Sequence, residues 1–270
     1  MISVLQLGII DYATGLAIQQ RLVELRKDGR IGDVLLLLEH SAVITLGRNA
    51  KRSNILASDE LLGQRGVEVF ECDRGGDVTF HGPGQLVGYP IFDLRGFPAP
   101  DGKRKTLGAV EFVRRLEEVL IRTCADFAIP AKRICGLTGV WTSPNQEETA
   151  KDKRGSDAAE AKIAAIGVHI SRGVTSHGFA LNVNTDLEYF KLIVPCGITT
   201  KPVTSMAAEL RRQLSLQEVA HSLSRNFGLI FGSQMLWLEN LDAVLRDVGV
   251  PVKPPAELRQ LHKEEDTFWA

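Results

Sequence analysis

The sequence predicts one α/β domain, in which helices pack around a mixed, largely antiparallel central sheet. Short β-prone runs alternate with longer amphipathic stretches, and no internal repeat or linker divides the 270 residues. The clearest strands, 163–170 and 174–184, are joined by Ser171, Arg172 and Gly173, whose turn chemistry predicts a β-hairpin. One core of substantial size is therefore expected.

The N-terminal elements are expected to alternate between strands and short helices. Only a short link through Ser41 separates strands 34–39 and 43–46, which favours antiparallel neighbours, and His40 in that link is interpreted as a turn residue rather than a ligand. The elements predicted here are strand 2–9, helix 12–27 capped by Asp11, strands 34–39 and 43–46, helical turn 59–62 and strand 67–71.

The C-terminal elements follow a long amphipathic helix. In that helix Arg114, Arg115, Glu117 and Glu118 are expected to be solvated, and Cys124 lies on the apolar face. Residues 1–232 are predicted to form the main folded domain, with a polar surface loop at 143–161, and residues 233–270 a C-terminal helix and polar tail. The remaining predicted elements are strand 87–94, helix 105–127, strand 132–142, a short helix at 186–192, a helix to 214 capped by Thr204 or Ser205, and helices 215–227 and 237–248.

Composition excludes several classes of function. A formal net charge of −1 argues against nucleic acid as a partner, because phosphate binding needs a basic surface. The first ten residues lack the features of an export signal, and the longest aliphatic run is too short to span a bilayer. We therefore expect a cytoplasmic protein without membrane contact, and a monomer as the simplest assembly.

Cys196 is the best candidate nucleophile. Proline fixes φ on one side of it, and glycine permits close backbone approach on the other, as suits a thiol at the rim of a pocket. The other cysteines, Cys72, Cys124 and Cys135, are expected to be buried. The four show no CxxC pair and no spacing typical of a metal site, so neither a metal nor a cofactor is predicted.

The residues alone do not decide which group activates Cys196. A histidine could act as base, and His81, His169 and His177 are possible. Alternatively, the ammonium of Lys162, which opens the first strand of the hairpin, could stabilise the thiolate. The residues alone indicate thiol-dependent acyl chemistry and no more.

A glycine-rich stretch, 74–95, is the other candidate site. Its glycine spacing fails the dinucleotide fingerprint and no Walker lysine follows, so nucleotide binding of those types is rejected. It is either a structural turn or a loop that cradles a substrate with Arg74 and His81.

Four motifs in this order resemble the lipoyl(octanoyl) transferases, which are similar to the catalytic domain of biotin and lipoate protein ligases. The motifs are RGGDVTFHGPGQLVGYPIFDL, GLTGVWT, KIAAIGVHISRGVTSHGFALNVNTDL and PCGI. The similarity extends from LLLLEH to about Phe231. The chain departs from the family pattern in HSAVITLGR, in the 143–161 loop and in its extended C-terminus.

The resemblance implies an acyltransferase that moves an octanoyl group from octanoyl-acyl carrier protein to a lysine. The acceptors would be the lipoyl domains of 2-oxoacid dehydrogenase complexes and the glycine cleavage H protein. By position, Cys196 would hold the acyl group as a thioester, and Lys162 would favour its thiolate and serve as acid and base. The implied substrate-binding residues are Arg74, Gly75, Gly76, Asp77, Val78, Thr79, Phe80, His81, Ala165, Ile166, Gly167, Gly178, Phe179 and Ala180.

Two other interpretations remain. An ATP-dependent lipoate or biotin ligase resembles this fold, but the nucleophilic thiol would be superfluous there. A non-catalytic module that binds acyl carriers or lipoyl domains would need neither Cys196 nor ATP.

Overall fold

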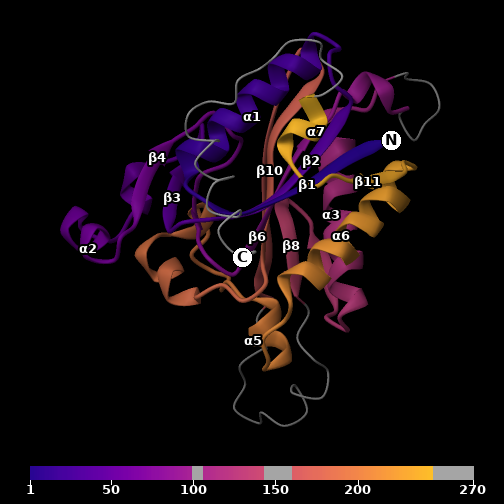
Figure 1. Cartoon of the computed structure of the whole chain (residues 1–270). Helices are drawn as coiled ribbons and strands as arrows, with labels where there is room; N and C mark the ends of the chain where they lie inside the picture. Colours follow the sequence, from indigo (N-terminus) through magenta and orange to yellow (C-terminus); the bar gives the residue numbers. More distant parts are fainter. Residues whose placement is uncertain (99–105, 143–159, 246–270) are drawn as a thin grey trace, which may run out of the picture.

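An eight-stranded sheet forms the centre of the structure (Figure 1). The computed structural model describes residues 1–98, 106–142 and 160–245. The strand order is β11-β1-β2-β6-β10-β9-β8-β7, in which β1 pairs in parallel with β2 and β11 and the other neighbours are antiparallel. The predicted mixed, largely antiparallel sheet is confirmed. Its strands are β1 (Ile2–Ile10), β2 (Asp33–His40), β6 (Gln85–Ile91), β7 (Ala131–Ile134), β8 (Leu137–Thr142), β9 (Lys162–Ser171), β10 (Val174–Asn182) and β11 (Met235–Trp237).

A second sheet of three strands, β3 (Val43–Leu46), β4 (Glu68–Glu71) and β5 (Val78–His81), lies beside the first, in the order β4-β3-β5. The prediction that 34–39 and 43–46 pair is therefore wrong. Both edges of β2 are already occupied by β1 and β6, so the chain leaves the sheet after His40. His40 is also no turn residue, because it ends β2 with a fully buried side chain.

Helices cover both faces of the large sheet. On one face lie α3 (Ala109–Asp126) and α6 (Leu216–Phe231), and on the other α1 (Tyr12–Lys27) and α7 (Leu241–Leu245) (Figure 1). Strand β2 serves both cores, because Leu35 and Leu37 pack towards the first face and Leu36 and Leu38 towards the second. A strand buried on both faces reads as a continuous apolar run, and the sequence has one here.

Three predicted elements need correction. The glycine-rich stretch contains β5 and β6 rather than a loop up to residue 87. Strand 132–142 is a hairpin of β7 and β8, since Gly136 has φ +78 and Cys135 lies exposed at the turn. The helix predicted to begin at Trp237 begins at Leu241, because Trp237 belongs to β11. Strand β11 lies after residue 232 and pairs with β1 of the large sheet. The division at 232 stays a prediction.

The helix caps agree with the sequence. Asp11 accepts the backbone N–H of Thr14, and Ser215 that of Glu218. Predicted helices 105–127, 204–214 and 215–227 have different ends in the structure, and segments 99–105, 143–159 and 246–270 lie outside the described residues. Short elements complete the chain: η1 (Arg52–Asn54), α2 (Asp59–Gln64), η2 (Leu94–Gly96), η3 (Leu187–Leu192), η4 (Pro195–Gly197) and α5 (Met206–Leu210).

Two buried side chains on α3 differ in their agreement with the sequence. Cys124 is fully buried as predicted, and burial raises the pKa of its thiol to about 12, so it is an inert core residue. Glu117 is equally buried, which contradicts its predicted solvation. Its carboxylate instead accepts from the guanidinium groups of Arg114 and Arg133.

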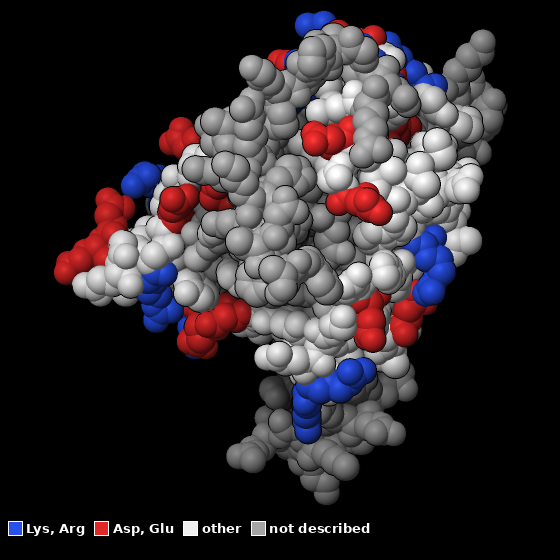
Figure 2. All heavy atoms as spheres, in the orientation of Figure 1, with Lys and Arg blue, Asp and Glu red and all other residues white. Residues whose placement is uncertain are grey.

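The described surface carries charges of both signs. On the face in Figure 2, basic and acidic side chains lie interspersed over the coloured surface. Within the described ranges, no helix is long and apolar enough to cross a membrane, and no cluster of three or more His, Cys, Asp and Glu side chains could hold a metal ion.

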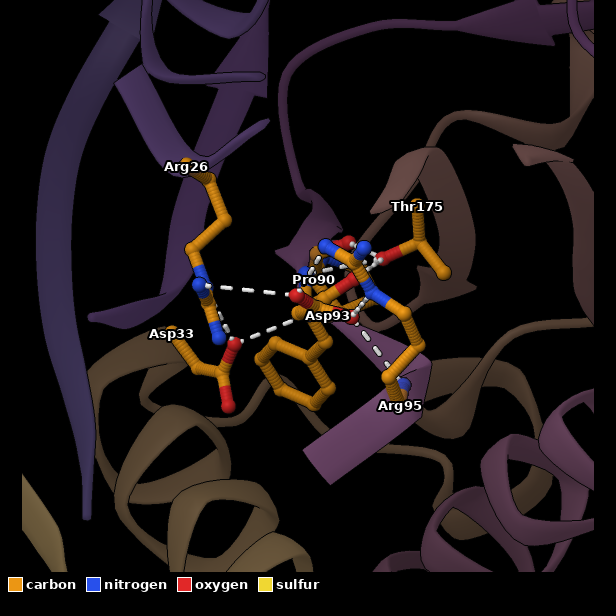
Figure 3. A network of polar contacts seen from close by, with 7 residues as sticks. Arg26, Asp33, Pro90, Asp93, Arg95 and Thr175 are labelled. Atoms are coloured by element: carbon orange, nitrogen blue, oxygen red, sulfur yellow. Dashed lines mark hydrogen bonds and ion pairs between the residues drawn. The ribbon is translucent and has the colours of Figure 1, made fainter. Parts of the chain in front are cut away.

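A polar network joins α1, β2 and β10 at one end of the large sheet (Figure 3). Asp33 accepts from Nε of Arg26 at 2.8 Å and from the backbone N–H of Asp93 at 2.9 Å. The Asp93 carboxylate accepts from Nε and Nη2 of Arg95 at 2.8 and 2.7 Å. The hydrogen bonds from Arg95, and then the charges of Arg26 and Arg95, hold the pKa of Asp93 below its usual range.

Asp93→Asn is therefore expected to lower the free energy of unfolding by about 1–2 kcal/mol near neutral pH. A carboxylate whose pKa is depressed on folding stabilises the protein above its unfolded pKa of about 3.9, and that contribution is lost as the pH falls. The difference between wild type and Asp93→Asn should thus shrink below about pH 4 in urea denaturation. Asp59→Asn is the control, because Asp59 pairs with Arg52 on the open surface; an equal effect of both variants would contradict the prediction.

Candidate active site

A cavity of about 390 Å³ lies between the β9–β10 hairpin and the segment that leads into β5. Its volume falls in the range of small-molecule sites, about 300–1,000 Å³. Lys162 and Cys196 both line it, together with small residues of β9 and β10. This places the two separately predicted candidate regions, the glycine-rich stretch and the hairpin, around one space.

Lys162 and Cys196 are in direct contact. Nζ of Lys162 donates to Sγ of Cys196 at 3.2 Å, although 34 positions separate the two residues. Lys162 is only 7% exposed, while Cys196 is half-buried. An ammonium at this distance stabilises a thiolate. Within the described residues, no hydrogen bond joins Cys196 to a histidine.

The contact follows from how the chain returns to β9. The Lys162 N–H donates to the carbonyl of Pro202 at 2.8 Å, and the Lys162 carbonyl accepts from the Thr204 N–H at 2.9 Å. These bonds form a parallel bridge between Lys162 and Val203, six residues after η4. The short connection between η4 and the bridge therefore holds the thiol near the start of β9.

Cys196 itself has an uncommon backbone. Its φ of 56° and ψ of 21° lie in the left-handed region, which β-carbon crowding makes costly for residues other than glycine. The turn is held from outside, because the Val194 N–H donates to the Asn54 carbonyl at 2.7 Å. Strain of this kind is concentrated at functional sites.

Gly197 also has a positive φ, of 68°, and a β-carbon there would lie 2.8 Å from Oδ2 of Asp77. Asp77 cannot move freely, since Oδ2 accepts from Asn54 and Oδ1 from the Val78 N–H. Gly197→Ala is therefore expected to displace the cysteine turn.

We expect this variant to lower stability by about 1–2 kcal/mol and the rate of Cys196 alkylation at neutral pH by about tenfold. Thermal unfolding and peptide mass spectrometry measure the two effects. Gly63→Ala, a glycine with open space around it, is the matched control. Wild-type alkylation in Gly197→Ala would show that the turn tolerates a side chain.

The floor of the cavity consists of small residues paired across the hairpin. Ala165 lies opposite Ala180, and Gly167 opposite Gly178. A β-carbon at Gly167 would lie 2.6 Å from the Gly75 carbonyl oxygen, so glycine permits the glycine-rich segment to approach the sheet. Phe179 borders the cavity too, but its ring packs in the core against Phe227.

Two of the predicted substrate-binding residues, Val78 and Phe80, do not line the cavity. Side chains alternate along β5, so Thr79 and His81 face it, whereas Val78 and Phe80 pack into the core of the small sheet. The other twelve do line it: Arg74, Gly75, Gly76, Asp77, Thr79, His81, Ala165, Ile166, Gly167, Gly178, Phe179 and Ala180.

Arg74 is a buried cation at the cavity wall. Its guanidinium donates to Oγ1 and the carbonyl oxygen of Thr45 and to the carbonyl of Gly75. It is 8% exposed, and no carboxylate is among these partners. Arg74 therefore fixes the glycine-rich segment against β3.

The buried histidines are kept neutral. Burial lowers the pKa of His81 to about 3 and that of His40 to about 4. Nδ1 of His81 contacts Oε1 of Gln85 at 2.7 Å, and His40 contacts the hydroxyl of Tyr89 at 2.7 Å. These contacts hold both imidazoles in place and fit structural roles.

His177 and Asp73 form a separate pair at 2.7 Å. Burial lowers the pKa of His177 although Asp73 opposes the shift. Burial alone would raise the pKa of the Asp73 carboxyl, but the hydrogen bond and charge of His177 outweigh burial and lower that pKa. His169 contacts Asp73 as well, at 3.0 Å.

Seven further residues line the cavity that the sequence does not predict as site residues, although Tyr89, Ile198 and the three from GLTGVWT lie within the motifs. They come from α1, from the loop after β3, from β6, from the β7–β8 turn and the start of β8, and from the segment after η4, and no spacing relates these segments. They are Tyr12, Asn49, Tyr89, Gly136, Leu137, Thr138 and Ile198.

Known proteins resemble this chain along most of its length. The family model of the lipoyl protein ligase A/B catalytic domain matches residues 11–228. The chain is 59% identical over 266 residues to an octanoyltransferase of Koribacter versatilis, covering 98% of each chain. It is also 59% identical over 251 residues to an octanoyltransferase of Acidobacterium capsulatum, covering 92% of this chain and 98% of the relative.

Solved structures share the fold at low identity. A bi-partite lipoate protein ligase from Thermoplasma acidophilum matches with a TM-score of 0.65 and 15% identity, over 92% of this chain and 91% of that one. P. falciparum LipL1 in complex with lipoate matches with a TM-score of 0.65 and 12% identity, over 97% and 71%. The predicted likeness to lipoate ligases in fold is confirmed.

Proposed function

The chain belongs to the lipoyl protein ligase A/B catalytic-domain family and is an octanoyltransferase, and we propose that it transfers the octanoyl group through a thioester on Cys196. The donor is octanoyl-acyl carrier protein, and the acceptor is the side-chain amine of a lysine on a lipoyl domain. The observation that carries this proposal is the 3.2 Å contact between Lys162 and Cys196 at the wall of a cavity.

In the first step the Cys196 thiolate attacks the carbonyl carbon of the donor thioester. A carbon–sulfur bond to Cys196 forms, the bond to the carrier's thiol breaks, and the leaving sulfur takes a proton from the Lys162 ammonium. The contact between Nζ and Sγ supports this role, because the leaving sulfur departs from the carbon that Sγ attacks.

In the second step the acceptor amine attacks the acyl-enzyme. A carbon–nitrogen bond forms, Cys196 leaves as the thiolate, and the neutral Lys162 amine takes the proton that the acceptor nitrogen loses. The pair thus returns to thiolate and ammonium. The first step exchanges one thioester for another, and the second converts a thioester into a more stable amide. Neither step needs ATP, because the donor is already activated as a thioester.

The acyl chain lies over the small residues at 165, 167, 178 and 180. Burial of about six methylenes contributes roughly 5 kcal/mol at ~0.8 kcal/mol each, before the cost of binding. The backbone N–H groups of Gly75, Gly197 and Ile198 already donate within the chain, so the donors to the oxyanion must lie elsewhere.

We place the reaction in the cytoplasm. The four cysteines are free thiols. A nucleophilic thiol must stay reduced, and the reducing cytoplasm maintains that state. The acceptors we propose are the lipoyl domains of 2-oxoacid dehydrogenase complexes and the glycine cleavage H protein.

Transfer without ATP tests the proposal. The purified chain, octanoyl-acyl carrier protein and an apo lipoyl domain are mixed, and intact-mass spectrometry follows all three. We expect the lipoyl domain to gain one octanoyl mass without ATP, and the chain to carry the same mass when the acceptor is left out. Modification only with free octanoate and ATP would indicate a ligase, and binding without modification a non-catalytic module.

A further inference from the structure

Trp141 lies directly beside the amine of Lys162. The two residues are partners across β8 and β9, and Nζ lies 4.9 Å from the centroid of the indole ring. The face of an aromatic ring carries partial negative charge and attracts an ammonium within about 6 Å, most strongly for tryptophan. With Trp141 1% exposed and Lys162 7% exposed, this attraction acts away from water.

A β-bulge creates this pairing. Val140 pairs with Ala164, so a regular register would set Trp141 opposite Ile163. The register shifts between Val140 and Trp141, which places Trp141 opposite Lys162 instead. A one-residue shift exchanges the faces of a strand, so the bulge decides that ring and amine lie together.

Gly139 closes the other side of the lysine. A β-carbon there would lie 3.2 Å from Cε and 3.7 Å from Nζ of Lys162, and the φ of +122° requires glycine in any case. The buried carboxylate of Glu117 accepts the Gly139 N–H at 3.3 Å, which ties this wall to α3. The side chain of Lys162 is thus confined between Trp141 and Gly139.

The charges around the amine leave it dependent on the ring. No carboxylate pairs with Lys162 in the part of the chain that the structure describes. Lys201 also lies over the ring, at 5.9 Å, but its ammonium contacts Glu160 at 2.6 Å. On the β5 side, Asp77 is engaged by Asn54 and by backbone N–H groups.

We propose that Trp141 is a positioning residue, whose ring face holds the charged amine of Lys162 against Cys196. This rests on the proposed role of the Lys162–Cys196 pair and adds the group that keeps the pair together and charged. Without the ring, the ammonium is less stable at its buried position, and the thiolate loses its neighbouring charge.

The test is the pH dependence of Cys196 alkylation by iodoacetamide, measured on the Cys196 peptide by mass spectrometry. We expect Trp141→Leu to move the midpoint to higher pH and to slow alkylation at neutral pH by about tenfold, with Trp141→Phe in between. A purely structural role would change the melting temperature without moving the midpoint.

Fluorinated tryptophans distinguish the electrostatic effect of the ring face from the effect of the ring's shape on packing. In a Trp237→Phe, Trp269→Phe background, Trp141 is the one tryptophan left of three. We expect the midpoint to rise with each added fluorine, because fluorine removes negative charge from the ring face. This series gives a result even where Trp141→Leu fails to fold.

Lys162→Met separates the two proposals. If it moves the midpoint and the Trp141 variants and fluorinated series do not, the role of Trp141 is overturned and that of Lys162 stands. If Lys162→Met leaves the midpoint unchanged, both roles are overturned, while the thioester on Cys196 is still judged by its own mass measurement.

Discussion

Cys196→Ser is expected to remove the acyl-enzyme completely and to lower octanoyl transfer by at least about 10³-fold. A serine hydroxyl is far less acidic than a thiol, so the ammonium of Lys162 cannot hold it ionised. Serine is slightly smaller than cysteine and its hydroxyl can also accept a hydrogen bond from Nζ of Lys162, so the fold should be unchanged. Intact mass after mixing with octanoyl-acyl carrier protein measures the first effect, and transfer to a lipoyl domain the second.

Cys135→Ser is the matched control. Cys135 lies exposed in the β7–β8 turn, so it is more accessible than Cys196, and within the described residues no hydrogen bond joins its thiol to a lysine as one joins Cys196 to Lys162. We expect it to acylate and transfer like the wild type. An octanoyl mass that persists in Cys196→Ser and disappears in Cys135→Ser would move the nucleophile to the turn and contradict the proposed site.

Local chemistry explains what the sequence could predict of the fold. The β9–β10 hairpin, the capped start of α1 and the start of α6 depend on residues within a few positions of one another. The division of the strands into two sheets does not depend on such local residues. It depends on which strand edges are free to pair, and this is decided by segments far apart in the sequence. Strands β2 and β3 are near neighbours in sequence, yet they do not pair, because both edges of β2 are paired with β1 and β6.

The candidate site shows the same limit. The motifs that resemble a known family pointed to Lys162 and Cys196, but the residues alone left the activating group open. The motif predicts every residue from Arg74 to His81 as a lining residue, but alternate side chains of a strand point to opposite faces, so Val78 and Phe80 pack in the core of the small sheet. Burial of Glu117 has no signal in the sequence, since it depends on Arg114 and Arg133. Trp141 lies in the GLTGVWT motif, but its position beside Lys162 depends on a β-bulge that the sequence does not reveal.

Lys162→Met should have the second largest effect, lowering the acylation rate of Cys196 at neutral pH by about 10²–10⁴-fold. Methionine is an uncharged side chain of similar length, so it keeps the packing against Trp141 and Gly139 but provides neither a charge nor a proton. A free thiol is only a few per cent ionised at pH 7 and titrates near pH 8.5. The rate in the variant should therefore rise about tenfold per pH unit up to that region, while the wild type should depend less on pH.

Acylation in single turnover, followed by mass between about pH 6 and 9, tests this dependence, because thiolate formation and acid–base catalysis contribute differently to it. If Lys162 only stabilises the thiolate, the variant reaches the wild-type rate at high pH. If it also transfers the proton, a gap remains there, and the second step, attack by the acceptor amine, is slowed as well. Lys201→Met is the control: Lys201 lies over the same ring but pairs with Glu160, so its loss should change neither step. A Lys162→Met variant with the wild-type rate at neutral pH would show that the thiol is activated by another group, and His177 and His81, which line the same cavity, would be the next to replace.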